Sequence, residues 1–397
     1  MTNMILKKFT YCAPVIGLIF LSACKEKYFP PAGQSNMNFL VVDGTLINGP
    51  DSTYIRLSRT KKLDDTSPNG GEQNARITVE DAEGNTLYNF TPVNNAGLYT
   101  IPGMNLDLNK KYRVRINTTD GNQYVSDDIS VKATPPVDSI NWVKRGDGVT
   151  IYANTHDPLN NTKYYRWEYL ETWDYYTHYF SEIKYFNKPP NILDSMFQPR
   201  KADEFVYHCW KTNPSTQILL GTSLKLSEDV ISLAAVRFIP QSAFELSSIY
   251  SILVKQYSLT KESFEYFENI KRISEQTGSL FDAQPSELKG NISNINKSDE
   301  PVIGYLTACS LSQQRIFISK EQVKPWNYLD YCPERKLVPL ILDSIQIFFG
   351  GASPQLTPIA KVTNPRTGRV DWISGGLPIC ADCLSRGATN VKPDFWP

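Results

Sequence analysis

The cysteine at position 24 has the surroundings that most clearly indicate chemistry. It follows Leu-Ser-Ala at 21–23, and a cysteine after such residues resembles the bacterial lipobox, where the thiol receives a diacylglyceryl group and becomes the new N-terminus. A short positive segment and an apolar stretch at 9–21 come first. That stretch has signal-peptide length and is shorter than the ~20 apolar residues that a membrane span requires. The sequence therefore predicts a signal peptide over 1–23 and an acylated Cys24.

Acylation predicts attachment to a membrane by lipid. Each buried methylene contributes about 0.8 kcal/mol, so several acyl chains together anchor a protein stably. No later stretch reaches the ~18 uninterrupted apolar residues of a transmembrane helix. Residues 24–37, which include Pro30 and Pro31, have the composition of a tether. We expect a water-soluble body at the outer membrane, on the cell surface.

The remaining cysteines predict disulfides. Of the seven in the chain, Cys12 leaves with the signal peptide and Cys24 takes lipid. An exported protein meets an oxidising space, but sequence cannot choose among the possible pairings. Zinc at Cys380 and Cys383 is the weaker interpretation, since a second close pair is absent. The disulfide candidates are Cys209, Cys309, Cys332, Cys380 and Cys383.

Recognised catalytic patterns are not found in the sequence. The three histidines, His156, His178 and His208, lack the spacing of a zinc helix, and no Gly-x-Ser-x-Gly elbow or phosphate loop occurs. His208 and Cys209 are adjacent, but neighbours on a strand point to opposite faces. Formal charge is zero, with no basic stripe for nucleic acid. We predict a protein that is not an enzyme, has no cofactor or metal and binds no nucleic acid.

Residues 164–186 are rich in aromatic side chains. A strand buries alternate residues, so we expect some of them on the surface, where an aromatic patch marks a partner or ligand site. The alternative is a large core with a tyrosine-rich rim. The residues predicted for this surface are Trp167, Tyr169, Trp173, Tyr175, Tyr176 and Tyr179.

Three Asp-Ser-apolar triplets resemble the acceptor of a bacterial periplasmic O-glycosylation system. Their serines are Ser139, Ser195 and Ser344. The same triplets also arise at strand starts, where Asp and Ser cap and an apolar residue enters the core. Both interpretations stay open.

The elements that position these residues are mainly strands. Apolar and polar residues alternate at 53–59 and 112–117, and Asp120-Gly121 is a hairpin signal. This pattern predicts an immunoglobulin-like β-sandwich over 38–134. Pro135-Pro136 marks a domain boundary, because paired prolines cannot continue a strand ladder.

Residues 135–397 are predicted to form a second, fibronectin-like β-rich domain. It includes strands at 314–319 and 344–349 and one inserted helix over about 260–277, which Thr260 caps. The predicted fold class is therefore mainly β, with tandem immunoglobulin-like and fibronectin-like β-sandwiches and one inserted helix.

An ordered set of motifs resembles a known family. The stretches that carry it lie at 208–220, 226–229, 236–240, 250–257, 278–286, 290–292 and 299–305, with Cys380-Ala-Asp-Cys383 and Asn390-Val-Lys-Pro-Asp-Phe-Trp396. Together they resemble the domain-of-unknown-function 4249 lipoproteins of Bacteroidota. The resemblance implies a gene beside a TonB-dependent outer-membrane transporter. It also implies an accessory subunit that helps capture or gate a ligand, and it transfers no catalytic residues.

The alternative function is a stand-alone glycan-binding module or glycan hydrolase on the cell surface. It predicts a concave aromatic platform and, for a hydrolase, two facing carboxylates ~5–9 Å apart.

Mass spectrometry of the purified protein tests the anchor. We expect the chain to begin at an acylated Cys24, because the lipobox directs both lipid transfer and cleavage. An unmodified or uncleaved N-terminus would contradict the assignment.

Overall fold

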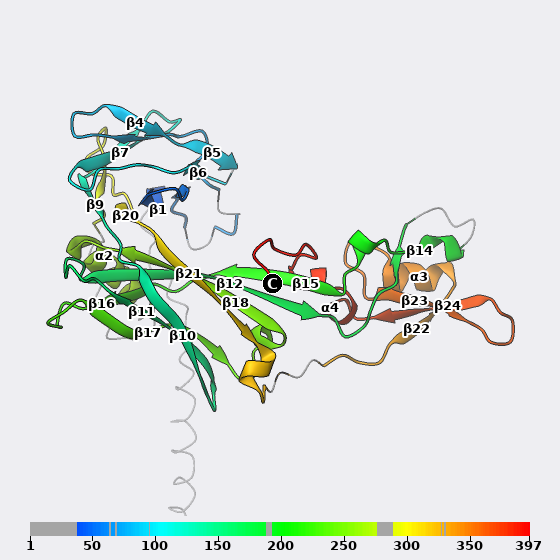
Figure 1. Cartoon of the computed structure of the whole chain (residues 1–397). Coiled ribbons are helices and arrows are strands. Elements are labelled where there is room, and N and C mark those ends of the chain that lie inside the picture. The colour runs from blue at the N-terminus through cyan, green and yellow to red at the C-terminus, as the bar shows by residue number, and fades with distance from the viewer. Residues whose placement is uncertain are drawn as a thin grey trace, which may run out of the picture.

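The computed structural model describes residues 38–397, except 63–64, 68–69, 95, 188–192, 276–288, 327 and 329–330. The predicted signal peptide, Cys24 and the tether lie outside the described residues. The structure is 47% strand and 13% helix, which confirms the mainly β fold class. Figure 1 shows an N-terminal sandwich above a central sandwich, with a third lobe to one side.

The N-terminal sandwich is formed by one eleven-stranded sheet that folds around a single core. Its main path runs β19-β8-β7-β9-β20-β1-β2-β6-β5, and β3 and β4 extend from β7. Its first nine strands are β1 (Leu40–Asn48), β2 (Thr53–Arg59), β3 (Arg76–Glu80), β4 (Thr86–Asn89), β5 (Thr91–Asn94), β6 (Leu98–Ile101), β7 (Lys111–Asn117), β8 (Gln123–Ser126) and β9 (Ile129–Lys132).

Two strands of this sandwich come from much later in the chain. They are β19 (Ile292–Asn294) and β20 (Thr307–Ser310), and β20 pairs in parallel with both β1 and β9. Leu306 and Ala308 join the N-terminal core. The predicted domain over 38–134 is therefore incomplete. Periodicity could not reveal this, because it reports local structure and not which distant strand fills a gap in a sheet.

The central sandwich packs a three-stranded sheet against a five-stranded sheet. The first contains β10 (Val137–Arg145), β11 (Gly148–His156) and β17 (Val230–Pro240). The second contains β12 (Tyr164–Tyr176), β15 (His208–Pro214), β16 (Leu219–Thr222), β18 (Ile249–Ser258) and β21 (Ser312–Ser319). Long β12 lies inside this sheet, with β18 on one side and β15 and β16 on the other.

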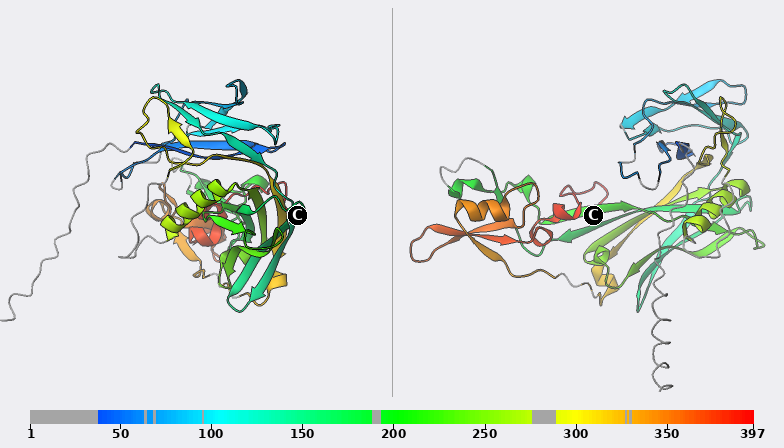
Figure 2. Two further views of the ribbon diagram at one scale, coloured as in Figure 1. Left: turned by 90° about the vertical axis from the view of Figure 1, so that its left-hand side faces the viewer. Right: turned by 180° about the vertical axis from the view of Figure 1, so that it is seen from behind.

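The third lobe has its own apolar core, so the region predicted as one domain contains two. Figure 2 shows this lobe extending away from the central sandwich. Its strands are β13 (Ile183–Tyr185), β14 (Phe197–Pro199), β22 (Lys336–Pro339), β23 (Thr357–Thr363) and β24 (Val370–Gly376). They form two separate small sheets, β13-β14 and β22-β24-β23.

The predicted strand at 344–349 is wrong, since this segment lies in helix α3 (Leu342–Phe349). Ile345 and Phe349, four residues apart, are buried together, whereas Ile347 is 57% exposed. The run Ser-Ile-Gln-Ile fits a strand as well as a helix over so short a length.

The inserted helix is confirmed as α2 (Lys261–Glu275). The backbone N–H of Ser263 donates to Thr260 Oγ1 at 3.3 Å, the expected N-cap. Phe264 packs against Tyr164 of β12, with ring centroids 5.0 Å apart. No helix within the described residues has the length and apolar composition to cross a membrane. The short helices are α4 (Pro378–Ala381), η1 (Leu193–Met196), η2 (Ala202–Glu204), η3 (Phe244–Leu246), η4 (Lys320–Val323) and η5 (Cys383–Arg386).

A fragment containing only residues 38–134 is expected not to fold cooperatively, because without β20 the strands β1 and β9 each lose a backbone partner. Thermal unfolding followed by circular dichroism checks this. The matched control joins 38–134 to 289–310 through a glycine-serine linker and is expected to unfold in one transition. A cooperative transition in the shorter fragment would contradict the discontinuous sandwich.

Candidate functional site

Two neighbouring chain segments join the N-terminal and central sandwiches. One leads from β9 to β10 and the other from β20 to β21. The Thr134 N–H donates to Ser310 Oγ at 2.8 Å, and the Val137 N–H donates to Ser312 Oγ at 2.9 Å. The Thr134 hydroxyl lies 2.9 Å from that of Ser258 in β18. The two segments are therefore bonded to each other as they cross between the lobes.

A small apolar cluster fills the joint behind these segments. It contains Ile47, Tyr257 and Cys309, with Leu311 packed against them. The predicted disulfide is wrong for Cys309, which is buried and bonds to no other cysteine among the described residues. Burial raises the pKa of its thiol to about 11. Cys309 thus acts as a small core residue.

A cleft opens beside this joint. Its walls are the outward faces of β1 and β2 in the N-terminal sandwich and of β12 and β18 in the central sandwich, and α2 closes one side. It consists of two adjoining cavities of about 460 and 680 Å³. The residues that line both are Asp43, Arg166, Glu168, Pro214 and Lys255.

Arg166 is the central cation of the cleft and connects its walls. Its guanidinium donates to Thr45 Oγ1 at 3.2 Å and lies 3.0 Å from the Glu168 carboxylate. It also sits over the rings of Tyr257 and Phe267, at 4.9 and 4.7 Å from their centroids. Two aromatic faces and one carboxylate therefore compensate this largely buried charge.

Both walls present an acid beside a base on neighbouring strands. Asp43 faces Arg56 across β1 and β2, and Glu168 faces Lys255 across β12 and β18. Glu168 bonds instead to Arg166 and accepts from the Tyr257 hydroxyl at 3.1 Å. Among the described residues, the side chains of Asp43, Arg56 and Lys255 have no hydrogen-bond or ion-pair partner. These charged groups are available to a ligand.

The motif search did not single out these residues. The alternation at 53–59 does place Tyr54 and Arg56 on the face opposite Ile55 and Leu57, and this was the available signal. Nothing local indicates that β12 and β18 lie across from that face. The cleft is assembled from segments far apart in the chain.

The aromatic surface predicted in 164–186 is wrong for four of its six residues. Trp167, Tyr169, Trp173 and Tyr175 are at most 7% exposed and belong to the central core. The physical reason is that β12 is an interior strand covered on both faces over its second half, where 171–175 are all buried. Tyr176, 49% exposed, and half-buried Tyr179 lie at the rim.

The structure pairs four of the five candidate cysteines, Cys209 with Cys383 and Cys332 with Cys380. Each pair has its Cα atoms 5.8 Å apart. Cys380 and Cys383 each bond to a distant partner, so the zinc interpretation of this pair is overturned.

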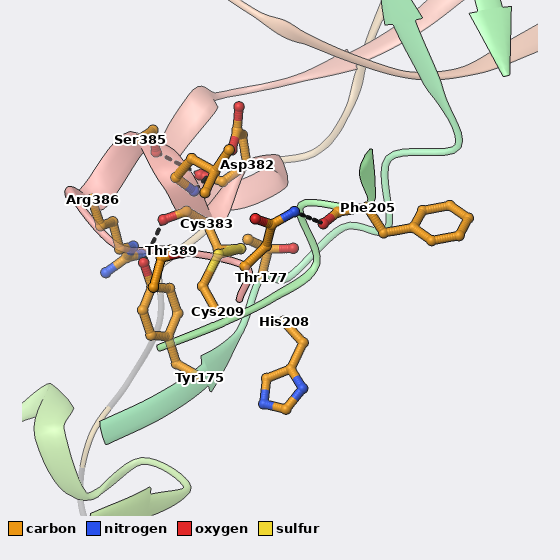
Figure 3. The surroundings of a disulfide bond; sticks show 12 residues. Tyr175, Thr177, Phe205, His208, Cys209, Asp382, Cys383, Ser385, Arg386 and Thr389 are labelled. Carbon is orange, nitrogen blue, oxygen red and sulfur yellow. Dashed lines mark hydrogen bonds between the residues drawn. A yellow bond between two sulfur atoms is a disulfide. The ribbon is translucent and has the colours of Figure 1, made fainter. Parts of the chain in front are cut away.

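Figure 3 shows the first disulfide between β15 and the C-terminal segment. The Tyr175 hydroxyl donates to the Cys383 carbonyl at 2.5 Å, and the Cys383 N–H donates to the Val206 carbonyl at 2.9 Å. The disulfides therefore lie where the third lobe meets the central sandwich.

The three predicted glycosylation serines lie in different settings. Ser139 is half-buried in β10, and its hydroxyl oxygen accepts from Asn154 Nδ2 at 3.1 Å. Ser195 is exposed in η1, and Ser344 is half-buried in α3. The strand-start explanation fits Ser139 alone. Modification of these serines stays a prediction.

The thiol of Cys309 is expected not to react with iodoacetamide at pH 8 in the folded protein. With a pKa of about 11, only about one thiol in a thousand is ionised at that pH, and the sulfur is buried. Intact-mass measurement checks this. The control is the same protein denatured without reduction. In the predicted mature form, which lacks Cys12 and has Cys24 acylated, it should gain one adduct, at Cys309. Rapid alkylation of the folded chain would contradict the buried assignment.

Comparisons with known proteins place the chain in a family. In solved structures, the trypsin-activated α2-macroglobulin of Escherichia coli is 12% identical over 59% of this chain and 15% of that chain, with a TM-score of 0.19. The chicken interferon gamma receptor alpha chain is 8% identical over 56% of this chain and 90% of that chain, with a TM-score of 0.17. Scores this low do not relate the folds, and no curated protein matches the chain. A family model described as Domain of unknown function (DUF4249) matches residues 25–315. Because that match covers most of the sequence, the protein belongs to the domain-of-unknown-function 4249 family.

Proposed function

We propose that this protein is a lipid-anchored lipoprotein on the outer-membrane surface of a Bacteroidota cell, an accessory subunit of a TonB-dependent transporter. In this role it captures a ligand in the cleft between the N-terminal and central sandwiches and delivers it to the transporter. The observation that carries the proposal is this cleft, with charged side chains on both walls that have no ion-pair or hydrogen-bond partner in the part of the chain that the structure describes.

The cleft supports ligand capture because a ligand can replace the water that hydrates its charged side chains. Asp43 and Lys255, on opposite walls, are partly or fully exposed and hydrated in the unbound protein. A ligand that matches both exchanges water for directed hydrogen bonds, and bonds to charged groups are the stronger class. Binding between two walls also buries more of the ligand than a flat surface would.

The predicted anchor supports delivery to a membrane partner. Acylation at Cys24 confines the protein to the bilayer surface, which raises its effective concentration near any protein in the same membrane. The tether at 24–37 leads directly into β1, the strand that carries Asp43. One wall of the proposed capture site therefore belongs to the lobe that follows the anchor in the chain.

The third lobe supplies a surface suited to a protein partner. Leu337 of β22 is 54% exposed, Ile341, which precedes α3, is 55% exposed, and Ile347 of α3 is 57% exposed. Several large apolar side chains exposed on one segment are typical of protein contacts. This lobe lies away from the N-terminal sandwich (Figure 2), so a partner there would leave the cleft open.

Affinity purification tests the partnership. The tagged full chain is extracted with detergent from the outer membrane of the organism that encodes it, and an outer-membrane barrel protein is expected to co-purify. Ile341→Asp with Ile347→Asp should reduce barrel recovery several-fold. Leu159→Asp is the matched control, since Leu159 is 76% exposed on the central sandwich. Purification of the wild-type chain without any barrel protein would contradict the proposal.

A further inference from the structure

We infer that the cleft between the N-terminal and central sandwiches binds a neutral oligosaccharide. This inference rests on the proposed role of the cleft as the capture site and adds the chemical class of the ligand.

Ligand contacts in this cleft must come from side chains. β1, β2, β12 and β18 each pair with neighbouring strands on both sides, so their backbone groups are already bonded within the sheets. A peptide that recognises a sheet by adding a strand needs an unpaired edge. The walls offer sheet faces instead. This arrangement favours a ligand recognised through polar groups around its surface.

On each wall a hydrogen-bond acceptor stands beside a donor, and this arrangement suits two adjacent hydroxyl groups of a sugar ring. Asp43 lies opposite Arg56 on one wall, and Glu168 lies opposite Lys255 on the other. In each pair a carboxylate that only accepts stands beside a cation that only donates. A hydroxyl both donates and accepts, so two neighbouring hydroxyls of a sugar ring satisfy one such pair. Gln313, opposite Lys255 on β21, offers both functions in one side chain.

Charge balance points to a ligand without net charge. The cations Arg56, Arg166 and Lys255 are matched by equally many carboxylates along the cleft, Asp43, Asp51 and Glu168. A site for a phosphate or a polyanion would carry an excess of cations.

Tyr54 adds the apolar component of the site. Its side chain lines the larger cavity and is 52% exposed, although the adjacent Ile55 is fully buried. An exposed tyrosine ring offers a flat apolar face with a polar tip, and the C–H face of a sugar ring packs on such a surface. The cavity of about 680 Å³ falls in the range of ~300–1,000 Å³ that holds small ligands. It has room for a few sugar rings.

Affinity electrophoresis of the full lipidated chain in detergent tests this inference. The native gels contain dextran, starch, xylan, galactomannan or mixed-linkage glucan, with polygalacturonate and alginate as acidic counterparts. We expect at least one neutral polysaccharide to retard the protein. The double variant Asp43→Asn with Lys255→Ala should weaken that binding about tenfold, because it removes a charged partner from each wall. Tyr54→Ala should weaken it as well.

The matched control is Lys225→Ala with Glu228→Gln, which changes the same charge types at exposed positions between β16 and β17. Its retardation should equal that of the wild type, and melting temperatures verify that every variant is folded. No retardation by any neutral polysaccharide, retardation by acidic ones alone, or equal retardation of the cleft variant would overturn the inference. A mixture of tryptic peptides serves as a second probe. Peptide binding by the wild type that the cleft variant loses and the matched control keeps would also overturn the inference.

Barrel recovery, measured separately, distinguishes this inference from the proposed function. Saccharide binding without a co-purifying barrel supports the ligand class and removes the transporter partnership. A barrel partner without saccharide binding supports the partnership and overturns the ligand class.

Discussion

The backbone pairing of residues 307–319 is the constraint on which the arrangement of the two sandwiches depends. The first part, β20, lies between β1 and β9 in the N-terminal sheet, and the second part, β21, pairs with β18 in the central sheet. Only Leu311 separates them, and its side chain packs in the joint. Because one extended segment belongs to both sheets, the lobes cannot rotate freely without breaking a ladder of backbone hydrogen bonds. The cleft width is therefore a property of the fold.

The cleft contains both a largely buried charge, which protein groups compensate, and exposed charges, which water hydrates. Arg166 is only 12% exposed in its side chain, so it must be compensated, and Glu168 and two rings do this. Asp43 stays hydrated at the surface, where leaving a charge unpaired costs little, since exposed ion pairs contribute only ~0–1 kcal/mol. Arg166 therefore serves the structure first, whereas Asp43 and Lys255 are retained at little cost to stability and are the better ligand-binding groups.

Local patterns predicted the elements that depend on local physics. The alternation at 53–59 became β2, and the Thr260 cap and apolar stripe became α2. Features set by distant neighbours were not predictable in this way. The burial of Trp173 depends on what covers β12, and the insertion of β20 depends on a gap between β1 and β9, whose paired residues lie 262 and 177 residues earlier in the chain. The cleft required both the register of two sheets and the joint between them, so no single motif marked it.

The central sandwich is held to the N-terminal sandwich and to the third lobe by different kinds of bond. At the N-terminal junction β20 and β21 continue from one sheet into the other, and backbone hydrogen bonds hold the lobes. At the third lobe no described sheet contains strands from both sides. The backbone bonds that cross this junction are isolated ones, such as the bond from the Cys383 N–H to the Val206 carbonyl, and they do not form a sheet ladder. Cys209–Cys383 and Cys332–Cys380 lie at this junction, where they restrict the unfolded chain and replace the missing ladder with covalent bonds. The covalent links thus occur where backbone bonds across the junction are isolated, as in the Trp210–Thr389 bridge beside Cys209, and no described sheet is shared. Cys309 lies at the junction where one extended segment belongs to both sheets, and it remains a thiol.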